Sequence, residues 1–292
     1  MFRGSIVAVV TPFKEDKTLD EEGLRRNVRF LVENNSSGLL ACGTTGESPA
    51  LTDEERERVI KIVIEEAKGK IPVIAGTGTN NTQKTIKYTQ HAKELGADAA
   101  LVITPYYNKP TQEGLYRHFV EVAKSTDIPI VIYNVPGRTG INILPKTIER
   151  IVKECKNVVA VKEASGNLDQ ATEIVARVGE KCGVLSGDDS KTLPILASGG
   201  KGVISVVANI IPSDVEKMIR LFEERKIEEA RKLHLKMYFL IKAMFIETNP
   251  GPVKEAMRML GMPAGPPRLP LAPVSESSRE VIRKELKNYG LL

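Results

Sequence analysis

Short hydrophobic runs rich in β-branched residues recur along the chain, separated by longer stretches of mixed polar and apolar residues. Successive runs start roughly 20 to 35 residues apart, which is about the size of one strand–helix unit. The runs are almost continuously apolar, as is typical of parallel strands covered on both faces. We expect eight strands, at Ser5–Val10, Gly38–Cys42, Pro72–Gly76, Ala99–Thr104, Ile130–Asn134, Val158–Lys162, Gly183–Ser186 and Gly202–Val207.

The stretches between these runs carry helix signals. Thr52-Asp53-Glu54-Glu55 is a capping box, and the residues after it are apolar at helical spacing. Ser213-Asp214-Val215-Glu216 predicts another helix start of the same kind. Gly69 and Gly96 stand where helices should end, because glycine readily adopts the left-handed conformation of a helix C-terminus.

Eight strands alternating with helices, with no linker between two halves, favour a closed (β/α)₈ TIM barrel. An open, doubly wound sheet is the structural alternative. After Phe222 the strand signal stops, and Ile227–Glu247, Pro252–Leu260 and Ser277–Asn288 are predicted as helices. We therefore predict an α/β protein with a catalytic barrel over residues 1–222 and a C-terminal helical region over residues 223–292.

Composition and charge narrow the classes of protein. Of 292 residues, 41% are hydrophobic, which excludes a disordered or fibrous chain. Forty-two Lys and Arg against 37 Asp and Glu give a net charge of +5, but no run of five or six like charges concentrates it. A dedicated nucleic-acid or membrane binder would concentrate that charge. Because no leader segment or membrane-length apolar stretch is evident, we expect a soluble protein of the cytoplasm.

The carboxyl ends of the strands are where the chemistry of a (β/α)₈ barrel gathers. Lys162 closes the fully apolar run that begins at Val158, so partial desolvation should lower the pKa of its ammonium group. A neutral amine in that place suits Schiff-base chemistry on a ketone. The alternative is a structural lysine that reaches solvent or pairs with Glu163.

Hydroxyl-bearing residues stand at the ends of other predicted strands. Thr44, Thr45, Tyr107 and Tyr133 are suited to relay protons while an imine forms and water leaves. Taken singly, each is as well explained by packing or turn formation. Arg138 follows Tyr133 in a loop and can bind a carboxylate through a bidentate fork, although it also fits a solvated loop arginine.

Other candidate sites are weaker. The three histidines, His91, His118 and His234, lack metal-ligand spacing and fall on predicted helices. Asp188-Asp189 fits a helix N-cap better than a cation site. Gly76-Thr77-Gly78-Thr79 has neither the Rossmann spacing nor the Walker lysine. Three scattered cysteines indicate neither a disulfide framework nor a zinc site.

Four motifs together resemble one family over essentially the whole chain. They are Gly43-Thr44-Thr45-Gly46-Glu47-Ser48, Tyr106-Tyr107-Asn108-Lys109-Pro110, Tyr133-Asn134-Val135-Pro136-Gly137-Arg138-Thr139-Gly140 and Val161-Lys162-Glu163-Ala164. The family is that of dihydrodipicolinate synthase (4-hydroxy-tetrahydrodipicolinate synthase), in the pyruvate-dependent class I aldolase superfamily. The resemblance implies a lyase of lysine and diaminopimelate biosynthesis that condenses pyruvate with L-aspartate 4-semialdehyde.

The resemblance also implies roles for individual residues. Lys162 would form the Schiff base, and Thr44, Tyr133 and Tyr107 would form a proton relay in which Tyr107 is donated across a subunit interface. Thr45 would contact the pyruvate carboxylate and Arg138 the carboxylate of aspartate semialdehyde, with the backbone of Gly187 and Ile204 facing substrate. A homotetramer built from two tight dimers is implied, with no metal or organic cofactor and neither nucleic acid nor membrane as a partner.

Regulation is the point where the sequence departs from family members that lysine inhibits. The corresponding effector positions are Ser48, Pro49, Asp53, Arg56, Asn80, Lys84 and Tyr106. Lys84 stands where a glutamate would receive the ammonium group of lysine, and like charge opposes that binding. We therefore expect weak or absent inhibition by lysine.

Several alternatives stay open from the sequence. N-acetylneuraminate lyase and 2-keto-3-deoxygluconate aldolase share the strand-end lysine and the Gly-Thr-Thr-Gly-Glu loop, whereas Arg138 and Tyr107 suit a short carboxylated aldehyde better than a sugar acid. A non-enzymatic keto-acid sensor on the same barrel is a second class. A weak nucleic-acid binder, suggested by the basic charge, is a third.

Overall fold

A computed structural model describes residues 2–292 of the chain. Eight strands form a closed barrel in sequential order, and every neighbouring pair whose register is resolved is parallel. This confirms the TIM barrel and excludes the open sheet. The strands are β1 (Gly4–Ala8), β2 (Gly38–Ala41), β3 (Val73–Gly76), β4 (Ala99–Ile103), β5 (Ile130–Asn134), β6 (Val158–Glu163), β7 (Gly183–Ser186) and β8 (Gly202–Ser205).

Nearly all strand residues are buried, which explains why hydrophobic runs alone located all eight strands. Between and after the strands lie the helices. They are α1 (Glu21–Glu33), η1 (Ser48–Ala50), α2 (Asp53–Ala67), α3 (Thr82–Glu94), α4 (Gln112–Lys124), α5 (Pro136–Thr139), α6 (Pro145–Glu154), α7 (Leu168–Val178), η2 (Asp189–Lys191), α8 (Thr192–Ala197), η3 (Val207–Asn209), α9 (Pro212–Glu223), α10 (Ile227–Ala243), α11 (Gly251–Met259) and α12 (Glu276–Tyr289).

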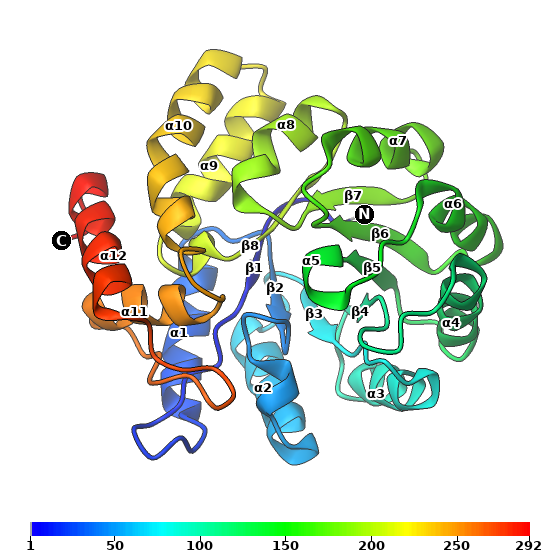
Figure 1. Cartoon of the computed structure of the whole chain (residues 1–292), viewed down its shortest axis with the longest axis horizontal. Helices are drawn as coiled ribbons and strands as arrows, with labels where there is room; N and C mark the ends of the chain where they lie inside the picture. Colours follow the sequence, from blue (N-terminus) through cyan, green and yellow to red (C-terminus); the bar gives the residue numbers. More distant parts are fainter. Residues whose placement is uncertain (1) are drawn as a thin grey trace. The chain divides into compact units, whose positions relative to one another are not determined.

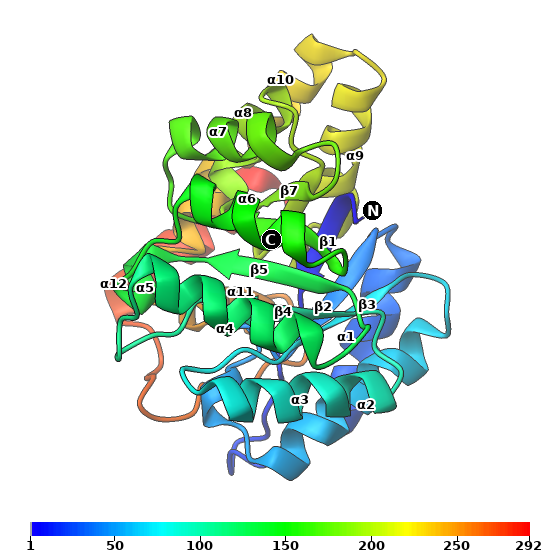
Figure 2. The same cartoon turned by 90° about the vertical axis from the view of Figure 1, so that its right-hand side faces the viewer.

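The chain divides into two compact units. The first comprises the residues up to Gly4 together with Ile74–Ile204, and within it α3, α4, α6 and α7 follow one another along the outside of β4 to β7 (Figure 1). The arrow of β5 points toward the short helix α5 (Figure 2). This unit therefore carries the strand ends that hold Tyr133 and Lys162.

The second unit comprises Ser5–Val73 and Ser205–Leu292, so the C-terminal helices share a unit with the first two strands. Within it, α10 packs against α9 and α12, and α12 also packs against α11. The barrel helix α9 ends at Glu223 and α10 begins at Ile227. Because the units divide at other positions, the boundary at residue 222 between a barrel and a helical region stays a prediction.

The capping box at α2 is confirmed. Thr52 Oγ1 accepts a hydrogen bond from the Glu55 N–H, and the Glu55 carboxylate accepts one from the Thr52 N–H. Gly69 and Gly96, which follow the C-caps of α2 and α3, both have positive φ, as expected.

The second predicted capping box is wrong. Helix α9 begins at Pro212, with Ile211 as its N-cap residue. Proline at the first helical position needs no N–H partner, so the helix starts without a side-chain cap. The Glu216 carboxylate instead accepts hydrogen bonds from the Ser5 N–H and the Ser37 hydroxyl, which ties α9 to the start of β1.

Helix α10 is shorter than expected, ending at Ala243 rather than Glu247. Its last turn tightens at Met244, whose N–H donates to the carbonyls of Leu240 and Ile241. The segment that follows then leads to Asn249, which contacts the loop after β2. None of the helices within residues 2–292 combines the length and apolar character that crossing a lipid bilayer requires.

Candidate active site

Lys162 lies in β6 with only 5% of its surface exposed. Burial disfavours the charged amine and lowers its pKa from an ordinary value of 10.5 to about 7. The negative charge of Asp189 opposes this shift, and the positive charge of Arg138 adds to it. A substantial fraction of the amine is therefore uncharged and nucleophilic at neutral pH, and the lowered pKa agrees with the sequence prediction.

Tyr133 lies beside Lys162 on the neighbouring strand. The two residues are register partners between β5 and β6, and Lys162 Nζ lies 4.3 Å from the centroid of the Tyr133 ring. The tyrosine is buried as well. A phenol and an amine of lowered pKa thus share one face of the barrel wall, an arrangement that can exchange protons with a bound ketone.

Glu163 is not the counter-ion of Lys162, contrary to the structural alternative that the sequence left open. Its side chain bonds to Asn134, Gln170 and the Ser165 N–H. Successive residues of a strand point to opposite faces, so Lys162 and Glu163 diverge. No described ion pair involves Glu163, and the amine of Lys162 is not held as an ammonium by it.

Asp189 is a residue that sequence reasoning missed. Asp188 is the N-cap of η2, accepting a hydrogen bond from the Ser190 N–H, and this confirms the capping prediction for the Asp-Asp pair. Asp189 itself is buried, and its carboxylate raises the pKa of Lys162. Its position three residues after the end of β7 could have indicated a place near the active site. Helix capping already accounted for both Asp188 and Asp189, so the sequence offered no reason to look further.

Arg138 lies in α5, a one-turn helix where the sequence indicated a loop. Pro136 at the first position and Gly140 with φ of 73° at the C-cap explain this turn. The arginine is exposed, and its charge reaches Lys162 strongly enough to lower that residue's pKa.

The remaining predicted residues of the first unit differ in exposure. Tyr107, in the loop after β4, is 88% exposed with a φ of 71°, so it is no part of the buried Lys162–Tyr133 pair. Ile204 is buried in β8. Gly187 packs where a Cβ would lie 2.6 Å from the Ala164 Cβ and 3.2 Å from Lys162 Cγ, so only glycine fits there.

Thr44 and Thr45 belong to the second unit, in the turn after β2. Thr44 is half-buried and Thr45 is buried. Asn249 Nδ2 donates a hydrogen bond of 3.0 Å to Thr45 Oγ1. Because that bond uses the acceptor side of the hydroxyl, Thr45 can direct its own proton elsewhere.

Glu47, in the same turn, forms a buried ion pair with Lys254 of α11. Lys254 Nζ lies 2.7 Å from Glu47 Oε1, and each side chain is 1% exposed. The other carboxylate oxygen accepts a hydrogen bond from the Arg268 N–H, and Lys254 also donates to the carbonyls of Thr11 and Pro266. The pair thus joins the Thr44–Thr45 turn to the C-terminal part of the chain.

Lys254→Met should lower the free energy of unfolding by about 3 to 5 kcal/mol, because it leaves the Glu47 carboxylate buried without its cation. Urea denaturation measures the change. Lys61→Met is the control, since Lys61 forms an exposed pair with Glu57 on α2 and should change stability by less than about 0.5 kcal/mol. Equal losses in the two variants would contradict the prediction.

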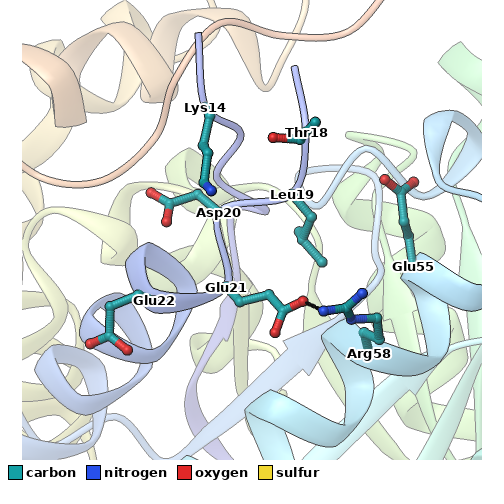
Figure 3. A pocket seen from close by; sticks show the side chains of 8 residues that line it. All are labelled: Lys14, Thr18, Leu19, Asp20, Glu21, Glu22, Glu55 and Arg58. Atoms are coloured by element: carbon teal, nitrogen blue, oxygen red, sulfur yellow. Dashed lines mark ion pairs between the residues drawn. The ribbon is translucent and has the colours of Figure 1, made fainter. Parts of the chain in front are cut away.

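A hollow of about 420 Å³ lies elsewhere in the second unit (Figure 3). Its lining carries four carboxylates against two cations, and Glu21 pairs with Arg58 across it. An excess of carboxylates repels carboxylate substrates, and none of the predicted site residues lines this hollow. Within residues 2–292, no group of three or more His, Cys, Asp or Glu side chains could hold a metal ion.

Comparison with known proteins points to one family. The model of the dihydrodipicolinate synthetase family matches residues 1–289. A 4-hydroxy-tetrahydrodipicolinate synthase of Geobacter sp. (strain M21) is 53% identical over 292 residues, covering 100% of both chains.

Solved structures agree. The dihydrodipicolinate synthase of Thermotoga maritima matches with a TM-score of 0.98 and 47% identity over 100% of both chains. An enzyme of the same name from Cyanidioschyzon merolae, solved with lysine bound, matches with a TM-score of 0.97 and 40% identity, over 100% of this chain and 99% of the other.

Proposed function

The chain belongs to the dihydrodipicolinate synthetase family, and from that premise we propose that Lys162 is the residue that forms a Schiff base with pyruvate. The observation that carries this proposal is the buried Lys162 amine, with a pKa of about 7, beside the Tyr133 ring. A lysine amine of ordinary pKa would be almost fully protonated at neutral pH, and in that form it could not attack a ketone.

The enzyme is a lyase of the class I aldolase type that condenses pyruvate with L-aspartate 4-semialdehyde. The product is 4-hydroxy-tetrahydrodipicolinate, and the reaction is the first committed step of lysine and diaminopimelate biosynthesis. The substrates meet as an enamine nucleophile and an aldehyde, so the enzyme must first convert the pyruvate ketone into an imine.

The proposed steps balance without an external reagent. The neutral Lys162 amine adds to the ketone carbon of pyruvate, and the carbinolamine loses water to give the imine. Loss of a proton from the methyl group gives the enamine, whose carbon attacks the aldehyde. The amino group of the semialdehyde then adds to the imine carbon and expels Lys162 as the free amine.

Tyr133 serves as the proton carrier nearest the imine, with Thr44 and Tyr107 as the other members of the relay. The exposure of Tyr107 supports a role across a subunit interface, since a phenol so far from burial needs a second chain to enclose it. We also propose a homotetramer built from two tight dimers, and sedimentation velocity would test it.

The remaining roles are contacts with the two substrates. Thr45 contacts the pyruvate carboxylate, a role supported by the Asn249 bond that leaves its hydroxyl proton available. Arg138 binds the carboxylate of the semialdehyde, supported by its exposure after β5. The backbone of Gly187 and Ile204 faces substrate, and the lack of room for a side chain at Gly187 supports close approach there.

We also propose a cytoplasmic location and no nucleic-acid or membrane partner. The +5 charge is spread along the chain. Both substrates are small, water-soluble acids, so the reaction requires neither a membrane nor a nucleic acid.

Trapping identifies the Schiff base directly. Borohydride reduction in the presence of pyruvate should add the mass of reduced pyruvate to the peptide that contains Lys162. Steady-state assays of condensation and of sugar-acid cleavage, run side by side, decide the substrate class. An unmodified Lys162, or higher catalytic efficiency in sugar-acid cleavage, would overturn the proposal.

Weak or absent inhibition by lysine is a further expectation. Lys84, on α3, places its ammonium 5.1 Å from the centroid of the Tyr88 ring, and Arg56 donates to Ser48. Because the positive charge of Lys84 opposes the binding of another ammonium group, millimolar lysine should leave the condensation rate nearly unchanged, although a relative has been solved with lysine bound. Lys84→Glu should strengthen inhibition, whereas Lys87→Glu on the same helix should not. Strong inhibition of the unaltered enzyme by sub-millimolar lysine would contradict the prediction.

A further inference from the structure

Two motif residues take no part in the proposed reaction, yet each directly follows a residue that does. Asn134 follows Tyr133 at the end of β5, and Glu163 follows Lys162 at the end of β6. The strands pair Tyr133 with Lys162 and Asn134 with Glu163. Because strand side chains alternate, the first pair occupies one face of the two strands and the second pair the other.

The Glu163 carboxylate is buried, with 2% exposure, and it accepts hydrogen bonds only from amide N–H groups within the described residues. Asn134 Nδ2 lies 2.9 Å and Gln170 Nε2 3.1 Å from Oε2, while the Ser165 N–H lies 2.6 Å from Oε1. A carboxylate only accepts, so it fixes the direction in which both side-chain amides point.

Asn142 completes what we call the amide cluster, consisting of Asn134, Asn142, Glu163 and Gln170. Its Oδ1 accepts from Asn134 at 2.7 Å and from Gln170 at 3.0 Å, while its Nδ2 donates to Gln170 Oε1 at 2.7 Å. The Ile143 N–H donates to Asn134 Oδ1. The cluster thereby joins the end of β5, the segment before α6, the end of β6 and the start of α7.

The pairing of β5 with β6 has an irregularity, and the amide cluster can stabilise the register beyond it. Ile130 pairs with Val158, but Val131 pairs with Ala160, so Val159 is an extra residue in the ladder. A change of one residue in register would move Lys162 to the opposite face of the sheet. The ladder between the irregularity and the strand ends is short, and the cluster closes it at the reactive end.

We infer that the amide cluster positions Lys162 and Tyr133 for imine formation, by fixing the register of β5 and β6 from the face opposite the substrate. This inference rests on the proposed function. Asn134 and Glu163 are positioning residues, since they act through Tyr133 and Lys162 and do not contact the reacting atoms. The cluster also occupies Glu163, so its charge is not available to pair with the Lys162 amine.

Glu163→Gln in the full-length enzyme tests the inference. The new amide brings N–H donors to a place where three N–H groups already converge, so at least one loses its acceptor. The rate of imine formation, measured as borohydride-trapped pyruvate on Lys162 against time, should fall about 10- to 100-fold, because a displacement of about 1 Å at reacting groups costs about that much. The label should still be on Lys162, whereas failure of the proposed function would leave the unaltered enzyme unlabelled there.

Glu66→Gln is the matched control. Glu66 is a buried carboxylate held by Arg25 and Arg29 between α1 and α2, outside the site. This variant should lower stability but leave the rate of imine formation within twofold of the unaltered enzyme. A rate within twofold in Glu163→Gln, or an equal slowing in both variants, would overturn the inference.

Asn142→Ala keeps the inference testable if Glu163→Gln does not fold. Asn142 is half-buried and bonds to the cluster without lying on either strand. Its removal should slow imine formation about 3- to 10-fold. The maximal rate should change more than the half-saturating concentration of pyruvate. An unchanged rate would count against the cluster as a positioning device.

Discussion

Replacing Lys162 with methionine should abolish condensation and at the same time make the protein more stable. The activity should fall by at least about a thousandfold, because no other group supplies the amine that forms the imine. Methionine has a similar length and shape, so the buried space stays filled. A coupled assay with pyruvate and aspartate semialdehyde measures the loss, and pyruvate with borohydride should leave the variant unlabelled.

The gain in stability follows from the lowered pKa of Lys162. Between pH 7 and 10.5 the unfolded chain holds a proton on Lys162 that the folded chain has released, so the contribution of Lys162 to the stability of the unaltered protein becomes more favourable as the pH rises across this range. Below pH 7 both states are protonated, and the cost of the buried charge is present in full. Lys162→Met should therefore be about 1 to 3 kcal/mol more stable at pH 7, with the advantage shrinking toward pH 10.

The same pKa sets the pH dependence of the reaction. The rate of imine formation in the unaltered enzyme should increase about tenfold between pH 6 and pH 8 as the amine loses its proton, and then level off. Lys156→Met, at an exposed lysine before β6, is the control and should change neither rate nor stability appreciably. A Lys162→Met variant that is less stable than the unaltered protein at pH 7 would mean that its amine is not desolvated.

The parts that the sequence predicted correctly are those that local patterns control. Each strand is a run of buried residues, so hydrophobicity located all eight, and Thr52 with Glu55 capped α2 because both partners lie within one turn. Lys162 stood out for the same reason, as a lysine that directly follows an apolar run. Desolvation is a local property of such a position, and its effect on the pKa could be anticipated.

Contacts between distant segments could not be anticipated in the same way. Glu47 meets Lys254, and Thr45 meets Asn249, across more than two hundred residues. Hydrophobic periodicity predicts strands and helices, but it does not predict which distant residues will pair. Glu216 is an instructive error, because its spacing from Ser213 fitted a capping box while its carboxylate bonds to the start of β1.

The two faces of β6 show how a motif can hold two functions. In the sequence, Lys162 and Glu163 are neighbours of opposite charge, and an ion pair between them is the simplest interpretation. The strand separates them: the amine is buried beside the Tyr133 ring, and the carboxylate lies among amides. A lysine can have a lowered pKa beside a glutamate in sequence only because strand geometry keeps the two groups apart.

Tyr133→Phe should reduce kcat by about 100- to 1000-fold, which is within the usual contribution of a positioned acid or base. The phenylalanine ring keeps the contact with the Lys162 amine and fills the same buried space, so pyruvate should bind with nearly the same affinity. The loss should therefore lie in the steps that move protons, which are the loss of water from the carbinolamine and the exchange of the pyruvate methyl protons with solvent.

Nuclear magnetic resonance separates these steps from binding, because exchange of the methyl protons in deuterated water reports enamine formation without the second substrate. The exchange rate in Tyr133→Phe should fall by the same factor as kcat. Tyr116→Phe is the matched control, since the Tyr116 hydroxyl bonds to Glu154 at the exposed outer face of the same unit and should leave exchange unchanged. If Tyr133→Phe exchanged methyl protons at the unaltered rate, another group would have to carry the proton, and Tyr133 would only support the position of the Lys162 amine.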